Sequence, residues 1–337
     1  MTLAGRVTSE GELIQRYLAP LACTNAGAFG LRDDAALLNI AQPLVMTMDA
    51  IAEGVHFLPG DPAADIGWKA VAVNVSDLIA KGATPRAYLM ALSFPEAPTH
   101  DWMADFARGL GEAQSAFGIT LIGGDTDRRP GPITITITAI GAAASGGSTG
   151  RHMVGRGTAR PGLLLYVTGT LGDAALGLVV RRREPRAAGW GLDAAQHAFL
   201  EASYLRPRPP LALAPLLVEY AAAAMDLSDG LAKDLGRMAA ASGVSAVVDL
   251  SRLPLSEPVT RALAVDASVV SAIVAGGDDY QVLCAVSHEH AADFEAAAHR
   301  CGVRLACIGA MGSGAGVTIR DGAGRAVAFG ATGYDHF

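Results

Sequence analysis

Aspartates in apolar or glycine-rich surroundings recur along the chain, and they are the residues best suited to bind a metal ion. The clearest is Asp125, which follows the apolar run Ile119 to Ile122 and the pair Gly123-Gly124. The run is typical of the end of a buried strand, and two glycines let the backbone turn or approach a ligand closely. Gly-Gly-Asp alone is more often a turn than a metal site. Similar stretches elsewhere add weight: Asp33-Asp34, Asp49, Asn74 with Asp77, Asp226 with Asp229, and Gly276-Gly277-Asp278-Asp279.

Carboxylates gathered in one site would repel one another. At a separation of about 5 Å each pair costs roughly 3 kcal/mol at an effective dielectric of 20. The chain has only three lysines, Lys69, Lys81 and Lys233. Divalent cations are therefore the simplest compensation, and ligation by oxygen alone favours Mg²⁺ over zinc. Because Mg²⁺ held by carboxylates usually also holds phosphates, the pattern predicts phosphoryl chemistry on a nucleotide.

The common nucleotide-binding motifs are missing from the sequence. No G-x-x-x-x-G-K-[ST] occurs, no lysine follows a glycine-rich loop, and no kinase H-R-D and D-F-G pair stands in a suitable order. A nucleotide site would therefore depend on metals, backbone amides and arginines.

Composition limits the class of protein. The 337 residues are 51% hydrophobic and 18% charged, enough for two domains with cores. A net charge of −7 without a basic run makes nucleic acid an unfavoured partner. No apolar stretch approaches the ~20 residues that span a bilayer. Four cysteines without Cys-x-x-Cys spacing indicate reduced thiols, so we expect a cytoplasmic protein with no membrane contact.

The elements that must position these aspartates follow from periodicity. A helix is expected over residues 65–81, closed by Gly82, with Asn74 and Asp77 on one face. It is apolar on most sides and so buried, where a carboxylate needs a partner: Lys81 in a structural role, or a metal in a functional one. The remaining expectations are strands at 35–40, 44–48, 88–94, 132–140, 163–167, 246–250, 280–286 and 303–308, helices at 8–20 and 211–223, a helix ending at 181–183, a helix bearing Leu231, Leu235 and Met238, a core stripe of Trp102, Phe106, Leu110 and Phe117, and a loop at 184–193.

A set of motifs runs in order along nearly the whole chain. Its members are Asp33-Asp34-Ala-Ala, Asp49 with Glu53-Gly-Val-His56-Phe, Asn74-Val-Ser-Asp77-Leu, Gly123-Gly-Asp-Thr, Thr168-Gly-Thr-Leu-Gly172, Leu205-Arg-Pro-Arg-Pro, Asp226-Leu-Ser-Asp-Gly-Leu231, Gly276-Gly-Asp-Asp-Tyr280 and Gly333-Tyr-Asp-His-Phe337. Single pieces occur across the superfamily named for aminoimidazole ribonucleotide synthetase. The complete set resembles the thiamine-monophosphate kinase family.

The resemblance implies an α/β (α+β) two-domain fold and a homodimer. Residues 1–148 would form an N-terminal ATP- and Mg²⁺-binding domain whose sheet dimerises, and residues 149–337 a C-terminal α+β domain. The implied activity is ATP-dependent phosphorylation of thiamine monophosphate to thiamine diphosphate by direct, Mg²⁺-assisted in-line transfer.

The resemblance also implies site residues, position by position. Mg²⁺ would be held by Asp34, Thr47, Met48, Asp49, Asp77, Asp125, Asp226 and Asp229. ATP would contact Phe117, Gly124, Asp125, Arg156 and Ser228. Thiamine monophosphate would contact His56, Asp278 and Tyr334. Asp125 and Asp229 would be catalytic through the metal, with no general base.

Three positions depart from the family pattern. Met48 replaces a polar Thr, so only its backbone carbonyl could reach a metal. Asp278 replaces a Glu and is one methylene shorter. Phe117 replaces a Tyr and keeps the ring for an adenine without the hydroxyl.

Other members of the superfamily are the nearest alternatives. A selenophosphate synthetase would carry a reactive Cys and Lys in an N-terminal glycine-rich loop, a context that Cys23 lacks. A hydrogenase-maturation relative would end in a cysteine, whereas this chain ends in Phe337. The ring-closing synthetase lacks the Gly-Val-His-Phe stretch. A non-catalytic metal- or nucleotide-binding protein is the alternative from another class.

Overall fold

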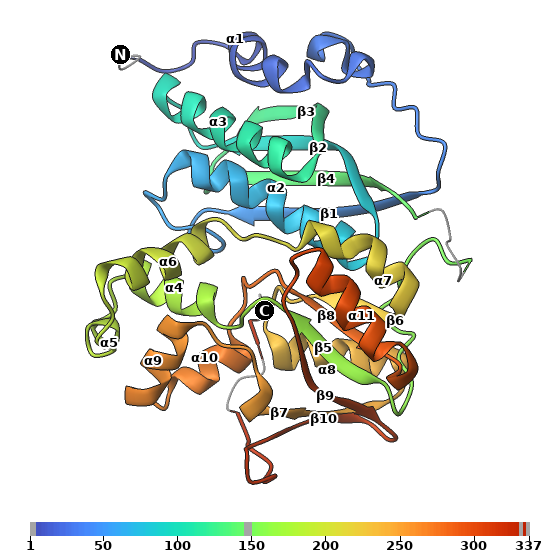
Figure 1. Ribbon diagram of the computed structural model, residues 1–337. Helices are drawn as coiled ribbons and strands as arrows, with labels where there is room; N and C mark the ends of the chain where they lie inside the picture. Colours follow the sequence, from blue (N-terminus) through green and yellow to red (C-terminus); the bar gives the residue numbers. More distant parts are fainter. Residues whose placement is uncertain (1–4, 145–149, 330–332, 335–337) are drawn as a thin grey trace. The chain divides into compact units, whose positions relative to one another are not determined.

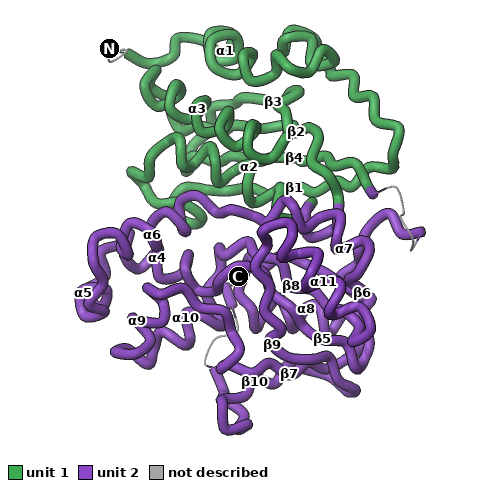
Figure 2. The backbone as a smooth tube through the Cα atoms, viewed as in Figure 1, with its two compact units in different colours: residues 1–78, 83–143 green, residues 79–82, 144–337 purple. Residues whose placement is uncertain are grey.

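The computed structural model describes residues 5–144, 150–329 and 333–334. The chain divides into two compact units, one of residues 1–78 and 83–143 and the other of residues 79–82 and 144–337 (Figure 2). We call them unit 1 and unit 2. The predicted domain boundary after residue 148 lies outside the described residues.

Unit 1 is built on a four-stranded sheet in the order β1-β4-β2-β3. The strands are β1 (Leu44–Ala52), β2 (Thr84–Phe94), β3 (Thr120–Arg128) and β4 (Thr134–Ala142). Strand β4 is antiparallel to both β1 and β2, and β3 is parallel to β2. The alternation of Thr with Ile predicted strand β4 correctly, because Ile135 and Ile137 are each 1% exposed and face the core.

Two helices, α2 (Ala63–Ala80) and α3 (His100–Phe117), lie over one face of this sheet (Figure 1). Helix α2 is buried on nearly all sides, as its composition predicted, and the chain leaves it through Gly82 at a φ of +76°. Helix α3 starts where the Thr99 side chain accepts a hydrogen bond from Trp102 N. Its predicted core stripe is confirmed for Phe106, Leu110 and Phe117, which are buried, while Trp102 is half-buried.

The N-terminal segment of unit 1 is a run of short helical pieces, and the helix predicted over residues 8–20 corresponds to the unbroken stretch from Glu10 to Ala22. It comprises the α-helix α1 (Glu10–Leu13), the π-helix η1 (Ile14–Leu18) and the 3₁₀ helices η2 (Ala19–Ala22) and η3 (Ala26–Leu31). The strand predicted at residues 35–40 is wrong, because this stretch is irregular. Leu37 N donates to Gly27 O at 2.8 Å, so the segment is bonded to its own local turn and not in a ladder of the sheet.

Unit 2 contains a six-stranded sheet in the order β10-β7-β9-β5-β8-β6. Strands β10 and β7 are parallel, and the other neighbouring pairs are antiparallel. The strands are β5 (Leu164–Thr168), β6 (Ala221–Asp226), β7 (Ser245–Asp249), β8 (Val282–Val286), β9 (Leu305–Gly312) and β10 (Gly316–Arg320).

Helices complete unit 2. They are α4 (Asp173–Arg181), α5 (Pro185–Ala188), α6 (Ala194–Leu205), the 3₁₀ turn η4 (Leu211–Leu213), α7 (Ala214–Tyr220), α8 (Leu231–Ser242), the 3₁₀ turn η5 (Leu250–Arg252), α9 (Glu257–Val265), α10 (Val269–Ala275) and α11 (His288–Arg300). Helix α8 was predicted, and its Leu231, Leu235 and Met238 are buried. Helices α7 and α11 lie side by side, with the rings of Tyr220 and Phe294 5.8 Å apart (Figure 1).

Two expectations for unit 2 are corrected. The helix predicted over residues 211–223 ends at Tyr220, because Ala221 to Asp226 pair with β8 as a strand. The loop predicted over residues 184–193 contains the short helix α5. The two-unit mixture of helices and sheets confirms the predicted fold class. Within the described residues, no helix is both long and apolar enough to cross a membrane.

Candidate active site

In unit 1, Asp125 lies inside β3 and not after its end, which corrects the expectation that the strand stops at Ile122. A Cβ on Gly124 would lie 1.8 Å from Met90 O, so the glycine is what allows β3 to approach β2 this closely. The Asp125 side chain is exposed, and its Oδ1 accepts a hydrogen bond from Thr126 N at 2.9 Å.

A cavity of about 780 Å³ opens beside Asp125. Its polar lining includes Asp33, Asp34 and Asp125, and Leu89 and Met90 are among its apolar walls. The structure therefore brings four of the predicted site residues to one cavity: Asp34, Met48, Gly124 and Asp125.

A second group of predicted ligands connects β1 to α2. The Thr47 hydroxyl donates to Asp77 Oδ2 at 2.5 Å, and Asp49 N donates to Asn74 Oδ1 at 2.9 Å. Side chains alternate along a strand, so Thr47 and Asp49 share a face of β1 and Met48 lies on the other. Unit 1 thus distributes its predicted metal ligands over both faces of the sheet.

His56 lies in the loop after β1. Its Nδ1 accepts from Ala52 N at 3.1 Å, so the neutral ring carries its proton on Nε2 and can donate from there. Lys69, 2% exposed, donates from Nζ to the His56 carbonyl at 2.9 Å. The ring of Phe117, predicted to contact adenine, packs 5.3 Å from that of Trp68 and is 5% exposed.

In unit 2, two chain segments pair where β6 ends at Asp226. Leu227 N donates to Gln281 O, Tyr280 N to Leu227 O, and Asp278 N to Ser228 O at 2.9 Å. A Cβ on Gly277 would lie 2.3 Å from Ser228 O, so the glycine allows this close pairing. The predicted ATP contact Ser228 and the predicted substrate contact Asp278 are thereby brought together.

The segment carrying Asp278 has an unusual backbone. Asp278 and Tyr280 have φ values of +71° and +48°, in the left-handed region that costs energy for residues with a Cβ. The Tyr280 hydroxyl donates to Asp278 Oδ1 at 3.1 Å. Asp279 points elsewhere and accepts from Gly172 N at 2.9 Å, and burial raises its pKa to about 8.

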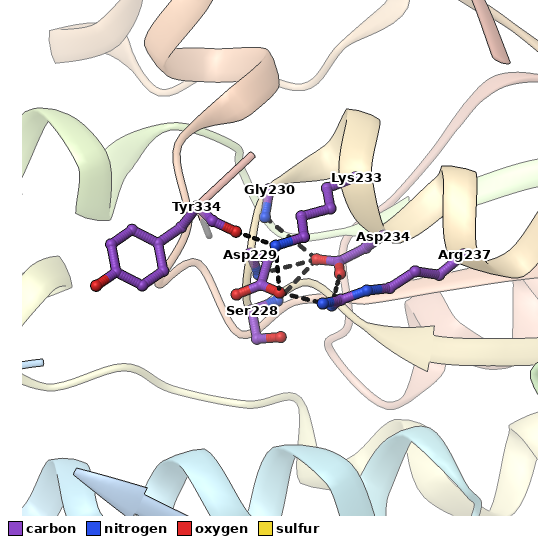
Figure 3. Close-up of polar contacts among 7 residues, drawn as sticks. All are labelled: Ser228, Asp229, Gly230, Lys233, Asp234, Arg237 and Tyr334. Atoms are coloured by element: carbon purple, nitrogen blue, oxygen red, sulfur yellow. Dashed lines mark hydrogen bonds and ion pairs between the residues drawn. The ribbon is translucent and has the colours of Figure 1, made fainter. Parts of the chain in front are cut away.

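The Ser228-Asp229-Gly230 loop is held by a carboxylate that the sequence did not single out (Figure 3). Asp234, fully buried at the start of α8, accepts at Oδ2 from Ser228 N at 3.1 Å, Asp229 N at 3.0 Å and Gly230 N at 3.2 Å. Burial raises the pKa of Asp234 to about 6, while the three amide donors and Arg237 favour its ionised form. Three donated hydrogen bonds fix the loop that presents Asp229.

Two cations surround the Asp229 carboxylate. Arg237 Nη1 lies 2.6 Å from Asp229 Oδ2 and 3.0 Å from Asp234 Oδ1, and Lys233 Nζ lies 3.6 Å from Asp229 Oδ2 (Figure 3). Sequence reasoning missed both. The spacing of Asp229 and Lys233, four residues apart at a helix start, was the available signal.

The last predicted residues of unit 2 are Tyr334 and Arg156. Tyr334 N donates to Asp229 O at 3.0 Å, while its ring is turned away from the cluster and is 46% exposed. Arg156 is exposed, and its carbonyl accepts from the Ser242 hydroxyl at 3.3 Å.

The donor chemistry of both units fits a hard divalent cation, since carboxylate, hydroxyl and carbonyl oxygens are what each presents. Among the described residues no group of three or more His, Cys, Asp or Glu side chains converges as a ready-made metal site. Mg²⁺ commonly takes only one or two carboxylates and completes its shell with water and phosphate oxygens. The individual metal assignments stay predictions.

Comparisons with known proteins match both units. Residues 32–143 match the family described as AIR synthase related protein, N-terminal domain, and residues 160–322 the corresponding C-terminal domain. The chain is 36% identical over 333 residues to the thiamine-monophosphate kinase of Salmonella typhimurium, covering 97% of this chain and 98% of that one.

Two solved structures extend the likeness. The thiamine-monophosphate kinase of Stenotrophomonas maltophilia is 36% identical with a TM-score of 0.81, covering 97% of this chain and 99% of its own. A ThiL protein complexed with AMPPCP and TMP is 30% identical with a TM-score of 0.75, covering 93% and 98%.

Proposed function

The chain belongs to the AIR synthase related family and, within it, to the thiamine-monophosphate kinases, and we propose that its residues carry out the reaction by direct transfer between the two bound substrates. The reaction is the ATP-dependent phosphorylation of thiamine monophosphate to thiamine diphosphate. The observation that supports the proposal best is the paired loops of unit 2. They bring Ser228 and Asp229, predicted for the nucleotide and its metal, together with Asp278, predicted for the acceptor.

The acceptor needs little activation. A phosphate monoester has a second pKa of about 6, so its oxygen is already ionised at pH 7 and no general base is needed. The bond between the γ-phosphorus and its bridging oxygen breaks, a bond to an acceptor phosphate oxygen forms, and ADP leaves. Mg²⁺ would neutralise the phosphate oxygens of the two polyanions. The chain's own contribution is to present Asp125 in unit 1 and Asp229 in unit 2, each as a carboxylate ligand for Mg²⁺, and to align the substrates.

The proposed binding residues fall into two sets, one for ATP and one for thiamine monophosphate. For ATP, Gly124 offers close backbone approach in unit 1, and Arg156 and Ser228 offer a charge and a hydroxyl in unit 2; Phe117 completes the predicted set. For thiamine monophosphate, His56 can donate from Nε2. Asp278 and Tyr334 suit the thiazolium cation, because a carboxylate attracts it and an aromatic face stabilises it.

The proposal includes a homodimer in the cytoplasm. Strand β1 is an edge strand of its sheet, and Leu44, Met46 and Met48 are 47%, 58% and 64% exposed on its outer face. An unpaired strand edge beside exposed apolar side chains favours association, and a second copy of this chain would cover both. Light scattering at micromolar concentration should show twice the 34.4 kDa chain mass, and a monomer would refute the dimer.

The direct experiment is an assay with ATP, Mg²⁺ and thiamine monophosphate that measures thiamine diphosphate. Product formation supports the proposal, and tight nucleotide binding without product would favour the non-catalytic alternative. Incubation with γ-labelled ATP in the absence of acceptor tests the mechanism. Direct transfer forms no phosphorylated enzyme, because the ionised acceptor can attack ATP itself. A stable label on the protein would therefore contradict direct transfer.

Tyr334→Ala tests the acceptor assignment. It should raise the KM for thiamine monophosphate and leave the KM for ATP nearly unchanged. Equal effects on the two constants would remove Tyr334 from the acceptor site.

A further inference from the structure

Lys233 contacts two segments of unit 2: residues 228–230, called the metal loop because Asp229 is a predicted metal ligand, and Gly333-Tyr334, called the tail. Its Nζ donates to the carbonyl of Tyr334 and lies 3.6 Å from Asp229 Oδ2 (Figure 3). Tyr334 N donates in turn to Asp229 O at 3.0 Å. The Tyr334 amide is therefore bonded to the loop that presents Asp229, and the Tyr334 carbonyl accepts from a lysine of the helix that follows that loop.

The fit at Gly333 supports close docking of the tail. A Cβ at this position would lie 2.5 Å from Lys233 Cβ and 2.7 Å from Asp229 O. Only a residue without a side chain lets the tail lie this close. The tail is held through its backbone, which leaves the Tyr334 ring outside the cluster and 46% exposed.

Hydrogen bonds and ion pairs hold the loop on which the tail docks. Asp234 receives three amide hydrogen bonds from residues 228–230, and Arg237 joins the Asp229 and Asp234 carboxylates. Helix α8 therefore fixes the loop to which the Tyr334 amide is bonded. Lys233, which binds the Tyr334 carbonyl, lies on the same helix.

We propose that Lys233 is a positioning residue that fixes the acceptor-binding tail to the metal loop, so that the placement of Tyr334 depends on the loop that holds Asp229. Lys233 acts through the Tyr334 backbone and does not touch the acceptor. The proposal rests on the proposed function, because it takes Tyr334 as an acceptor contact.

The test compares Lys233→Met with a matched control. Methionine keeps the length of the side chain and removes the ammonium. Lys81 is the control, because its Nζ also donates to a main-chain carbonyl of unit 2, that of Ala224 at 2.7 Å, away from the tail. Lys233→Met should raise the KM for thiamine monophosphate about tenfold, the scale of one lost charge-assisted hydrogen bond, and change the KM for ATP less than twofold. Lys81→Met should not produce this split.

Gly333→Ala removes the docking without removing a charge. Its added Cβ should displace the tail and reproduce the selective rise in KM. Lys233→Arg keeps a cationic donor and should restore part of the affinity. A rise confined to ATP or Mg²⁺ in Lys233→Met would mean that Lys233 only balances the Asp229 charge, and would overturn the proposal.

Amide hydrogen exchange at Tyr334 provides a readout that does not require turnover. Lys233→Met should speed exchange of this amide at least tenfold relative to wild type and to Lys81→Met, since its bond to Asp229 O opens more often. Unchanged exchange would overturn the docking. A wild-type protein that makes no thiamine diphosphate would instead refute the proposed function, and the two failures are therefore distinguishable.

Discussion

Unit 1 and unit 2 each present one aspartate predicted to be catalytic through a metal, Asp125 and Asp229, and the surroundings of the two differ. Asp125 is exposed on β3 and accepts a hydrogen bond from the next residue's amide. Asp229 lies on a loop fixed by Asp234, with Arg237 and Lys233 at its carboxylate. The first carboxylate is presented by a strand and the second by a charged network, so the same substitution should have different consequences in each unit.

The largest effect should follow Asp125→Asn. The change keeps the shape and one oxygen but removes a charge, so kcat should fall by about a hundredfold or more. Part of the loss should return at high Mg²⁺, because mass action refills a weakened site. The control is Asp127→Asn, two residues further along the same strand and also exposed. A loss of the same size at every Mg²⁺ concentration would contradict a role through the metal.

Asp229→Asn should reduce kcat by about tenfold to a hundredfold and also destabilise unit 2. It weakens the pairing with Arg237 and Lys233, worth up to about 1 kcal/mol for partly exposed groups, which corresponds to about 2–4 °C in Tm. Asp125→Asn should leave Tm within a degree or so. Thermal unfolding of both variants tests whether only Asp229→Asn lowers Tm. Equal shifts in Tm would contradict the difference between the two units.

Arg237→Gln should affect metal dependence more than turnover. The guanidinium lies 2.6 Å from Asp229 Oδ2 and competes with a cation for that oxygen. Its removal should lower the Mg²⁺ concentration for half-maximal activity by up to about fivefold, the scale of one partly exposed ion pair. Arg325→Gln, which breaks a surface pair with Asp321, is the matched control. An increased Mg²⁺ requirement would mean that Arg237 organises the loop instead.

The smallest effect concerns Asp279 and stability. Burial raises its pKa from the usual 3.8 to about 8, with the neighbouring charges of Asp173 and Asp278 adding to the rise. Between these values the folded state binds more protons than the unfolded state, so stability falls as pH rises from about 4 to 8. Asp279→Asn should flatten this dependence and raise Tm by a few degrees near pH 8. Tm measured from pH 5 to 9 tests it, and parallel curves would disprove it. The control Asp249→Asn should leave the slope unchanged.

Local periodicity predicted correctly those helices and strands whose apolar residues are also the ones that are buried. Helix α2 is apolar on most sides, and β4 alternates Thr with Ile, so burial and pattern coincide. The alanine run from Ala221 to Ala224 favours a helix by intrinsic propensity. It forms a strand because β8 lies beside it, and that partner lies about 60 residues further along the chain.

The candidate site shows the same limit. Gly277 could be read as a turn, but its contact with Ser228 O depends on chain segments nearly fifty residues apart. Asp234 in the first turn of α8 resembles an ordinary favourable charge at a helix start. Its burial and its three amide donors exist only once the loop has folded over it. The sequence therefore predicted the site residues Ser228, Asp229 and Asp278. The structure was needed to show that Gly277 and Asp234 hold their loops in place.

The three lysines share a feature with a practical consequence for amine chemistry. Lys69, Lys81 and Lys233 each donate to a main-chain carbonyl, of His56, Ala224 and Tyr334 respectively. A reagent that acylates or methylates amines must break such a contact before it can react. The rate of modification at each lysine therefore measures how often its segment opens, and three mass shifts report separately on the histidine loop, the strand β6 and the C-terminal tail.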